Sequence, residues 1–248
     1  NEITQIARTV GPDWATPEYD RNGNMTVIPQ PKEPTLAYRG IWDAWNRLTK
    51  LEEPDDGGWQ TLQENVYGGQ TRRVIRKDYE DGTPIETRHF YCTSQWQDIE
   101  ERLAGEIDPN LQYLWGLRYI DDLVLRDRDT DDNGTLDERL CVIQDANWSV
   151  SAICGPTGLL SQRIFYSPYG VVRFCTASAS NSTNVFDIEV LFTGIMRDSG
   201  TDFYIYRNRF YNPPLGCFAS RDPIAYQGDG LGLYAYCAAR PTFFVDPL

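Results

Sequence analysis

The chain has 248 residues, enough for one large all-β domain or two ordinary ones. Its formal net charge is -13 at pH 7 and it carries no Lys/Arg-rich run, which excludes attraction to the phosphate backbone of a nucleic acid or to an anionic membrane surface. Its apolar runs are broken by Arg, Asp or Gly before they reach the length of a membrane-spanning helix. His89 is the only histidine, which argues against a Ser-His-Asp site and against structural zinc.

Short runs of aromatic and β-branched residues alternate with turn formers along most of the chain. Strands are predicted at 72–79, 163–166 and 169–174. Turn sequences bound such runs at 81–84, 132–134 and 155–158. This recurrence of strand, turn and strand predicts an all-β array of antiparallel hairpins.

The segment 95–106 (QWQDIEERLAGE) is ambiguous. Its residues favour a helix, and Ile99 and Leu103 are four apart, as on one helical face. The neighbouring segments favour strands, and strand formation depends strongly on context. We therefore expect a strand here, with a helix as the alternative.

A weak internal repeat combines an aromatic residue with Asp or Gly. It occurs at 19–24, 42–48, 67–73, 144–148 and 166–170. The first three anchors, Asp20, Asp43 and Gly68, lie a little over twenty residues apart. A period of this size predicts stacked supersecondary units that bury their apolar faces against one another. An ordinary β-sandwich with chance similarity between hairpins is the alternative.

Four motifs follow one another in the C-terminal third. They are YRNRFYNPPLGCF at 206–218, SRDPI at 220–224, LYAY at 233–236 and FVDPL at 244–248. Their order and spacing resemble the RHS-associated core, with its pattern RYYDPxxGRFxSxDPIG…NLYAYxxNNPxxxxDPxG, and the upstream repeats resemble YD repeats. Asn212, Cys217, Ala225 and residues 238–240 depart from that pattern, which puts local turn geometry in doubt more than the fold.

The resemblance implies a domain organisation and a fold class. It divides the chain into a YD-repeat β-hairpin region (1–175), a linker (176–191) and the RHS-associated core (192–248). The implied fold is all-β, with consecutive antiparallel hairpins in a curved or spiral sheet that the core caps.

The resemblance also implies partners and a location. Such bacterial proteins are secreted or lie at the cell surface, and they enclose a variable C-terminal, toxin-like segment in a hollow shell. The expected partner is thus the protein's own C-terminal cargo, with other shell or secretion-apparatus proteins as further candidates, and neither nucleic acid nor membrane insertion. Because residue 1 is Asn and no signal-peptide pattern is visible, we expect the chain to be a piece of a longer product.

Three residues match positions that the resemblance assigns to self-cleavage: Arg209, Asp222 and Asp246. Two neighbouring carboxylates cannot both ionise easily, so one can activate water while the other donates a proton to the amide. Arg209 is expected to orient one carboxylate or to stabilise the developing oxyanion. The expected single-turnover cut lies just beyond Leu248.

Other interpretations of these residues remain open. Asp-Pro dipeptides are common in turns, and Arg209 is also compatible with a cation on a strand face. The corresponding alternative function is a non-catalytic extracellular structural, adhesion or filament-forming YD-repeat protein. We expect no external substrate in either case.

The sequence DTDDNGTLD at 129–137 resembles part of a calcium-binding loop. Oxygen-bearing residues stand at Asp129, Asp131, Asn133, Thr135 and Asp137, and Gly134 occupies the sixth position. The twelfth position is Leu140 instead of Glu, and the flanking runs are typical of strands. We therefore expect a polar hairpin tip around Asn133-Gly134 and no cofactor, with calcium binding as the alternative.

The six cysteines allow two interpretations. They are Cys92, Cys141, Cys154, Cys175, Cys217 and Cys237. They are compatible with up to three disulfides, whose pairing the sequence does not give, or with small buried apolar side chains. Both interpretations, and with them the redox compartment, stay open.

Overall fold

The computed structural model describes the chain except for residues 1, 8, 226–231, 243 and 245–248. The chain forms two compact units, one made of residues 1–86 with 198–248 and the other of residues 87–197. Of the helices in the described part, none is both long and apolar enough to cross a membrane.

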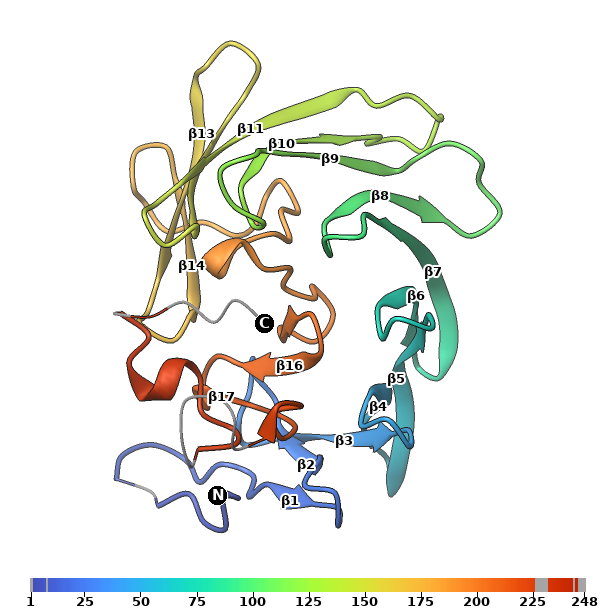
Figure 1. Cartoon of the computed structure of the whole chain (residues 1–248), viewed down its shortest axis with the longest axis vertical. Coiled ribbons are helices and arrows are strands. Elements are labelled where there is room, and N and C mark those ends of the chain that lie inside the picture. The colour runs from blue at the N-terminus through green and yellow to red at the C-terminus, as the bar shows by residue number, and fades with distance from the viewer. Residues whose placement is uncertain (1, 8, 226–231, 243, 245–248) are drawn as a thin grey trace. The chain divides into compact units, whose positions relative to one another are not determined.

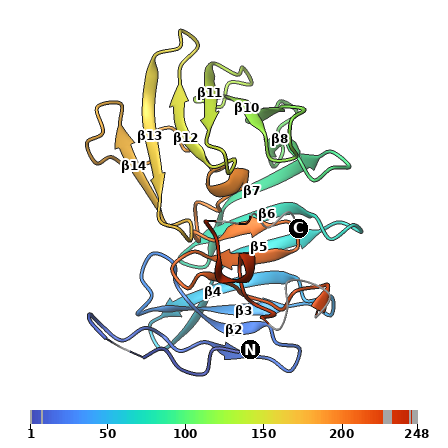
Figure 2. The same cartoon turned by 60° about the vertical axis from the view of Figure 1, so that its left-hand side comes forward.

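The first unit contains the first six strands, each antiparallel to its neighbour in the chain (Figures 1 and 2). These are β1 (Glu18–Tyr19), β2 (Met25–Pro29), β3 (Ala37–Trp42), β4 (Leu48–Asp55), β5 (Gly58–Tyr67) and β6 (Arg73–Glu80). Strand β7 (Thr83–Cys92) begins in this unit and ends in the second.

The second unit continues the same order, with each strand next to its predecessor in the chain. Its strands are β8 (Asp98–Leu103), β9 (Leu111–Trp115), β10 (Leu123–Arg128), β11 (Glu138–Gln144), β12 (Val150–Cys154), β13 (Leu160–Tyr166) and β14 (Val172–Thr176). Consecutive antiparallel hairpins were predicted, and this prediction is confirmed. Strand β8 also confirms a strand in 95–106, where pairing with β7 outweighs local helix propensity.

A recurrent turn explains the repeat seen in the sequence. In the turn after β3, the Asp43 backbone N–H donates to the Arg47 carbonyl at 3.0 Å, and Asn46 takes φ 59°. The Asp43 carboxylate accepts the backbone N–H groups of Trp45 and Arg47 at 2.9 and 3.0 Å. The same backbone bond from residue i to i+4 recurs at Asp20, Gly68, Thr93, Asp145, Gly155, Ser167 and Thr176. The repeated Asp, Ser, Thr or Gly therefore fixes the turn.

A second, small sheet follows in the C-terminal segment of the first unit. It contains β15 (Tyr204–Tyr206), β16 (Arg209–Asn212) and β17 (Cys217–Phe218), which pair in that order. In Figure 1 this sheet lies beside β2 and β3. One apolar core joins the two, with Met25, Ile28, Leu48 and Leu51 from the long sheet and Phe203, Phe210, Cys217, Ala219, Leu233 and Tyr234 from the C-terminal segment. Burial of each large side chain contributes roughly 1.5–3 kcal/mol, so this core holds the C-terminal segment on the repeats.

The second unit has its own smaller core. Leu111, Tyr113 and Leu123 pack with Val190, which belongs to the segment that follows β14. That segment contains the short 3₁₀ turn η1 (Phe192–Gly194), and a second such turn, η3 (Cys237–Ala239), lies in the first unit. The strands of the repeats are thus covered in each unit by chain from the C-terminal side.

Candidate active site

Arg209 is a buried cation at the start of β16, with 4% of its surface exposed. Its guanidinium carbon lies 3.6 Å from the centre of the Phe218 ring. Its Nη1 lies 3.0 Å from Oδ2 of Asp222. Stacking on a ring and pairing with a carboxylate fix the plane of the guanidinium, which a lysine ammonium does not reproduce.

Asp222 lies in the turn that follows β17, and 23% of its side chain remains exposed. Its Oδ1 accepts the backbone N–H of Ile224 at 2.9 Å, and its own carbonyl accepts the N–H of Ala225 at 2.9 Å. This is the turn geometry that an Asp-Pro dipeptide favours. The structure therefore brings together Arg209 and Asp222, two of the three residues predicted for self-cleavage. Asp246 lies outside the described residues.

A pocket of about 290 Å³ opens at this ion pair, within the first unit. Asp222 and Pro223 form part of its wall. The other lining residues are mostly polar or aromatic: Asn22, Asn24, Trp45, Asn46, Arg47, Tyr67, Thr71, Arg207, Asn208, Phe210, Ser220 and Arg221. The carboxylate of Asp222 is thus both held by a buried cation and next to open space.

The loop predicted to bind calcium forms the tip of the β10–β11 hairpin. The Asp129 carboxylate accepts the backbone N–H groups of Asp131, Asn133 and Gly134 at 3.3, 3.2 and 2.7 Å. Burial acts to raise the pKa of Asp129, but these N–H groups outweigh it and lower the pKa.

The oxygens of the loop's other predicted ligands also hold the loop together. The Asp137 carboxylate accepts the Thr130 hydroxyl, and Asn133 Oδ1 accepts the backbone N–H of Thr135. No three His, Cys, Asp or Glu side chains in the described part of the chain form a group that could hold a metal ion. Calcium binding here stays a prediction from the sequence pattern.

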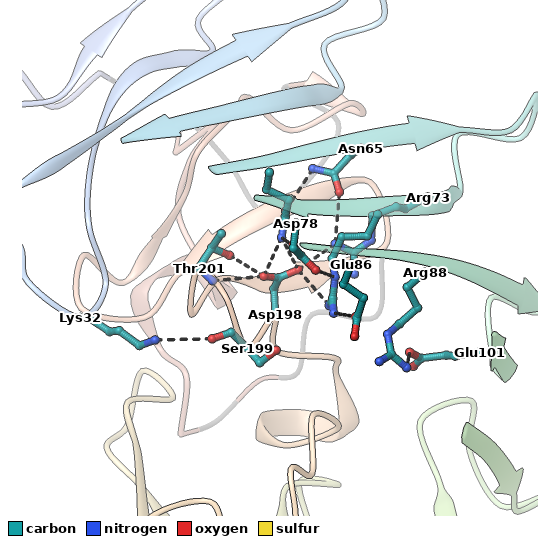
Figure 3. A network of polar contacts seen from close by, with 12 residues as sticks. Lys32, Asn65, Arg73, Asp78, Glu86, Arg88, Glu101, Asp198, Ser199 and Thr201 are labelled. Atoms are coloured by element: carbon teal, nitrogen blue, oxygen red, sulfur yellow. Dashed lines mark hydrogen bonds and ion pairs between the residues drawn. The ribbon is translucent and has the colours of Figure 1, made fainter. Parts of the chain in front are cut away.

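A buried polar cluster that was not predicted from the sequence surrounds Asp198, which has 0% exposure (Figure 3). Its Oδ2 lies 2.9 Å from Nη1 of Arg73 and 3.5 Å from Nη1 of Arg76. Gln63 Nε2 donates to both carboxylate oxygens, at 3.0 and 3.1 Å, and the Thr201 N–H and hydroxyl both donate to Oδ1. Asp198 thereby joins the C-terminal segment to β5 and β6.

A register shift explains why two arginines three apart reach the same carboxylate. On a regular strand, residues i and i+3 point to opposite faces. In the pairing of β5 with β6, Arg76 is opposite Asn65 but Arg73 is opposite Tyr67, so the strand gains one residue at Val74. This bulge returns Arg73 to the face of Arg76. The same one-residue bulge follows the turns at Asp43, Thr93 and Asp145, so it belongs to the repeated hairpin.

Burial alone would raise the pKa of Asp198. The charges of Arg76 and Arg73, with hydrogen bonds from Arg73 and Gln63, outweigh it and hold the pKa well below its ordinary value. The neighbouring Asp78 shows the opposite balance, because its burial and the charge of Asp198 raise its pKa. Asp198 is therefore ionised at neutral pH and enclosed by its partners.

No family model matches the chain. It is 27% identical over 246 residues to a protein named probable deoxyribonuclease RhsB of Dickeya dadantii (strain 3937). It is 26% identical over 245 residues to probable deoxyribonuclease RhsA of the same strain. Both alignments cover 98% of this chain and 16% of the relative. The chain is thus similar to RHS proteins along nearly its whole length.

Solved structures agree with this chain in fold. The crystal structure of TcdB2-TccC3 matches with a TM-score of 0.65 at 17% identity, over 94% of this chain and 13% of the other. The Photorhabdus luminescens Tc holotoxin pore with the TccC3-D651A mutation matches with a TM-score of 0.66 at 18% identity, over the same shares. The chain thus spans about one sixth or less of the proteins it matches.

Proposed function

We propose that the chain is the shell segment of a secreted RHS-repeat protein that encloses its own C-terminal, toxin-like polypeptide and separates from it by self-cleavage just beyond Leu248. The observation that supports cleavage is the 3.0 Å ion pair between Arg209 and Asp222 at the wall of a pocket. The RHS relatives named as deoxyribonucleases and the Tc-toxin neighbours support a toxin-like cargo.

In this proposal two carboxylates, those of Asp222 and Asp246, catalyse a single cleavage of the chain. Arg209 pairs with Asp222 and orients its carboxylate, and Asp222 removes a proton from a water molecule that attacks the scissile carbonyl. Asp246 supplies the proton that the departing amide nitrogen needs. The products are a shell ending in a carboxylate and a cargo beginning with an amine. Because the bond belongs to the same chain as the catalyst, proximity provides much of the rate.

The test is to express the chain with its natural downstream sequence and a C-terminal reporter, and to follow release by gel electrophoresis and mass spectrometry. We expect the parent to cleave, and Asp222→Asn and Asp246→Asn each to slow cleavage by at least about a hundredfold. Asp127→Asn is a matched control, because Asp127 is also a partly buried carboxylate paired with an arginine, Arg139, at 2.7 Å.

We expect the Asp127 variant to cleave at the parent rate. Release that continues in both Asp222→Asn and Asp246→Asn would contradict the catalytic assignment. A parent that never cleaves, with a folded shell and an intact reporter, would favour the non-catalytic structural role instead. Circular dichroism and urea unfolding of each variant separate lost chemistry from lost folding.

A further inference from the structure

Strands β11 and β12 set two cysteines directly opposite each other. Cys141 and Cys154 are register partners in this antiparallel pair. Opposite residues in such a pair have Cα atoms about 4.5 or about 5.5 Å apart, depending on the hydrogen-bond pattern, and their side chains leave the same face. A disulfide accommodates Cα separations of about 4.4–6.8 Å. The ladder therefore spaces these two residues for a disulfide with either pattern.

The opposition of two cysteines distinguishes this hairpin among the strand pairs that the structure describes. In β7, Cys92 is opposite Asp98, and in β14, Cys175 is opposite Arg163. In the small sheet, Cys217 is opposite Asn212. A disulfide between any of these and another strand cysteine needs a different register, whereas Cys141 and Cys154 need none.

We propose that Cys141 and Cys154 are a redox site that closes into a cross-strand disulfide in an oxidising environment. Both are thiols in the structure, and they differ in exposure: Cys154 is buried, and Cys141 is half-buried. This difference assigns the order of events, because a small disulfide in solution reaches Cys141 first. The inference rests on the pairing of β11 with β12 and does not require the proposed cleavage.

The exchange balances with oxidised glutathione as the oxidant. The Cys141 thiolate attacks one glutathione sulfur, the glutathione S–S bond breaks, and one glutathione thiolate leaves. The Cys154 thiolate then attacks Sγ of Cys141 and releases the second glutathione. Two protein thiols are oxidised, one glutathione disulfide is reduced to two thiols, and the two protein thiol protons pass to the departing glutathione.

The bond ties the two strands of one hairpin, closing the short loop that contains the turn at Asp145. Disulfides persist in secreted and periplasmic proteins and are rare in the cytosol. The state of this pair therefore reports whether the chain has left a reducing compartment. It also resolves one choice that the six cysteines left open, in favour of one bridge at this position.

The test equilibrates the full chain in a glutathione buffer, quenches with acid, and counts thiols after denaturation. We expect the parent to fall from six thiols to four and Cys141→Ser to stay at five. Cys154→Ser should fall from five to four as Cys141 takes up one glutathione. The Cys92→Ser variant is the matched control, because Cys92 is another half-buried strand cysteine. It should fall from five thiols to three.

Peptide mapping places the bond. Trypsin leaves both cysteines in one peptide, residues 140–163, which oxidation makes lighter by two hydrogens. Chymotryptic cleavage after Trp148 then gives two pieces that stay joined until they are reduced. The Cys154→Ser variant should accumulate glutathione on Cys141, which shows the first step alone. Six thiols retained by the parent, a bridge mapped to another pair, or a glutathione adduct that persists on Cys141 in the parent would each overturn the proposal.

Discussion

Two aspartates in the C-terminal segment each meet arginine, yet their surroundings differ. Asp198 has no exposed surface, and both of its oxygens are occupied by donors from Gln63, Arg73 and Thr201. Asp222 keeps part of its side chain exposed and has Arg209 on one oxygen and the N–H of Ile224 on the other. Asp222 also lines the pocket of about 290 Å³ described above.

The difference separates a structural charge from one that is available to a substrate. A carboxylate enclosed by donors has no room for water or a peptide, so its charge can only stabilise the arrangement around it. A carboxylate beside open space can accept a proton from a molecule that enters. A perturbed or paired acid therefore suggests chemistry only when its contacts leave a side open.

Asp198→Asn gives the largest expected effect on stability. The variant leaves the buried guanidinium groups of Arg73 and Arg76 without their full countercharge, which typically costs about 3–5 kcal/mol. Urea unfolding measures this loss. Asp222→Asn should cost only about 1 kcal/mol, because Arg209 keeps its contact with Phe218 and part of the pair is exposed. Equal losses in the two variants would remove the distinction between the two sites.

The next largest effect is expected in how the free energy of unfolding depends on pH. The pKa of Asp198 is lower in the folded chain than in the unfolded one. Its contribution is therefore complete above the unfolded pKa, about 3.9, and is lost as pH falls toward the lower folded pKa. Asp78, whose folded pKa is raised, changes stability in the opposite direction.

The measurement is the difference in unfolding free energy between the parent and Asp198→Asn from pH 7 to pH 2. Both proteins contain Asp78, but Asp198→Asn removes the charge of Asp198 that raises the pKa of Asp78, so only the part due to burial cancels. We expect a constant difference above about pH 5 that narrows below about pH 4. A difference that stays constant down to pH 2 would mean that the ion pair does not provide the stability.

The hairpin array could be predicted from local turn chemistry. Each turn of the Asp43 type is built from residues within five positions, and the side chain that fixes it is the one that recurs in the sequence. Strand β8 could be predicted only from its neighbours, because its own residues favour a helix. Of the candidate site, Arg209 and Asp222 were found from the motifs of the C-terminal third, and the structure places them in contact.

The Asp198 cluster could not be predicted from the sequence. Asp198 and Arg73 are 125 positions apart, and the bulge at Val74 that lets Arg73 reach it is shared with other hairpins, so it does not single out this site. Burial makes Asp198 a structural carboxylate, and the sequence of a turn-rich segment does not indicate that one of its polar residues will be buried. Long-range pairing of this kind depends on how the C-terminal segment settles on β5 and β6.

The smallest expected effect is the free energy of the contact between Arg209 and the ring of Phe218. Its guanidinium carbon lies 3.6 Å from the Phe218 ring centre, and both side chains are buried. A desolvated contact of this kind contributes about 2 kcal/mol, and a lysine in place of Arg209 keeps part of it because it keeps the charge. A double-mutant cycle of Arg209→Lys and Phe218→Leu, measured by urea unfolding, isolates it from the packing lost at Phe218.

We expect a favourable coupling of about 1 kcal/mol in that cycle. The same variants in the cleavage assay then test whether the ring holds Arg209 for Asp222. If it does, Phe218→Leu slows cleavage although it leaves both charges in place. A coupling near zero, with cleavage unchanged in Phe218→Leu, would mean that the ion pair orients Asp222 without help from the ring. In that case Asp222, already fixed by the N–H of Ile224, would need from Arg209 only its charge.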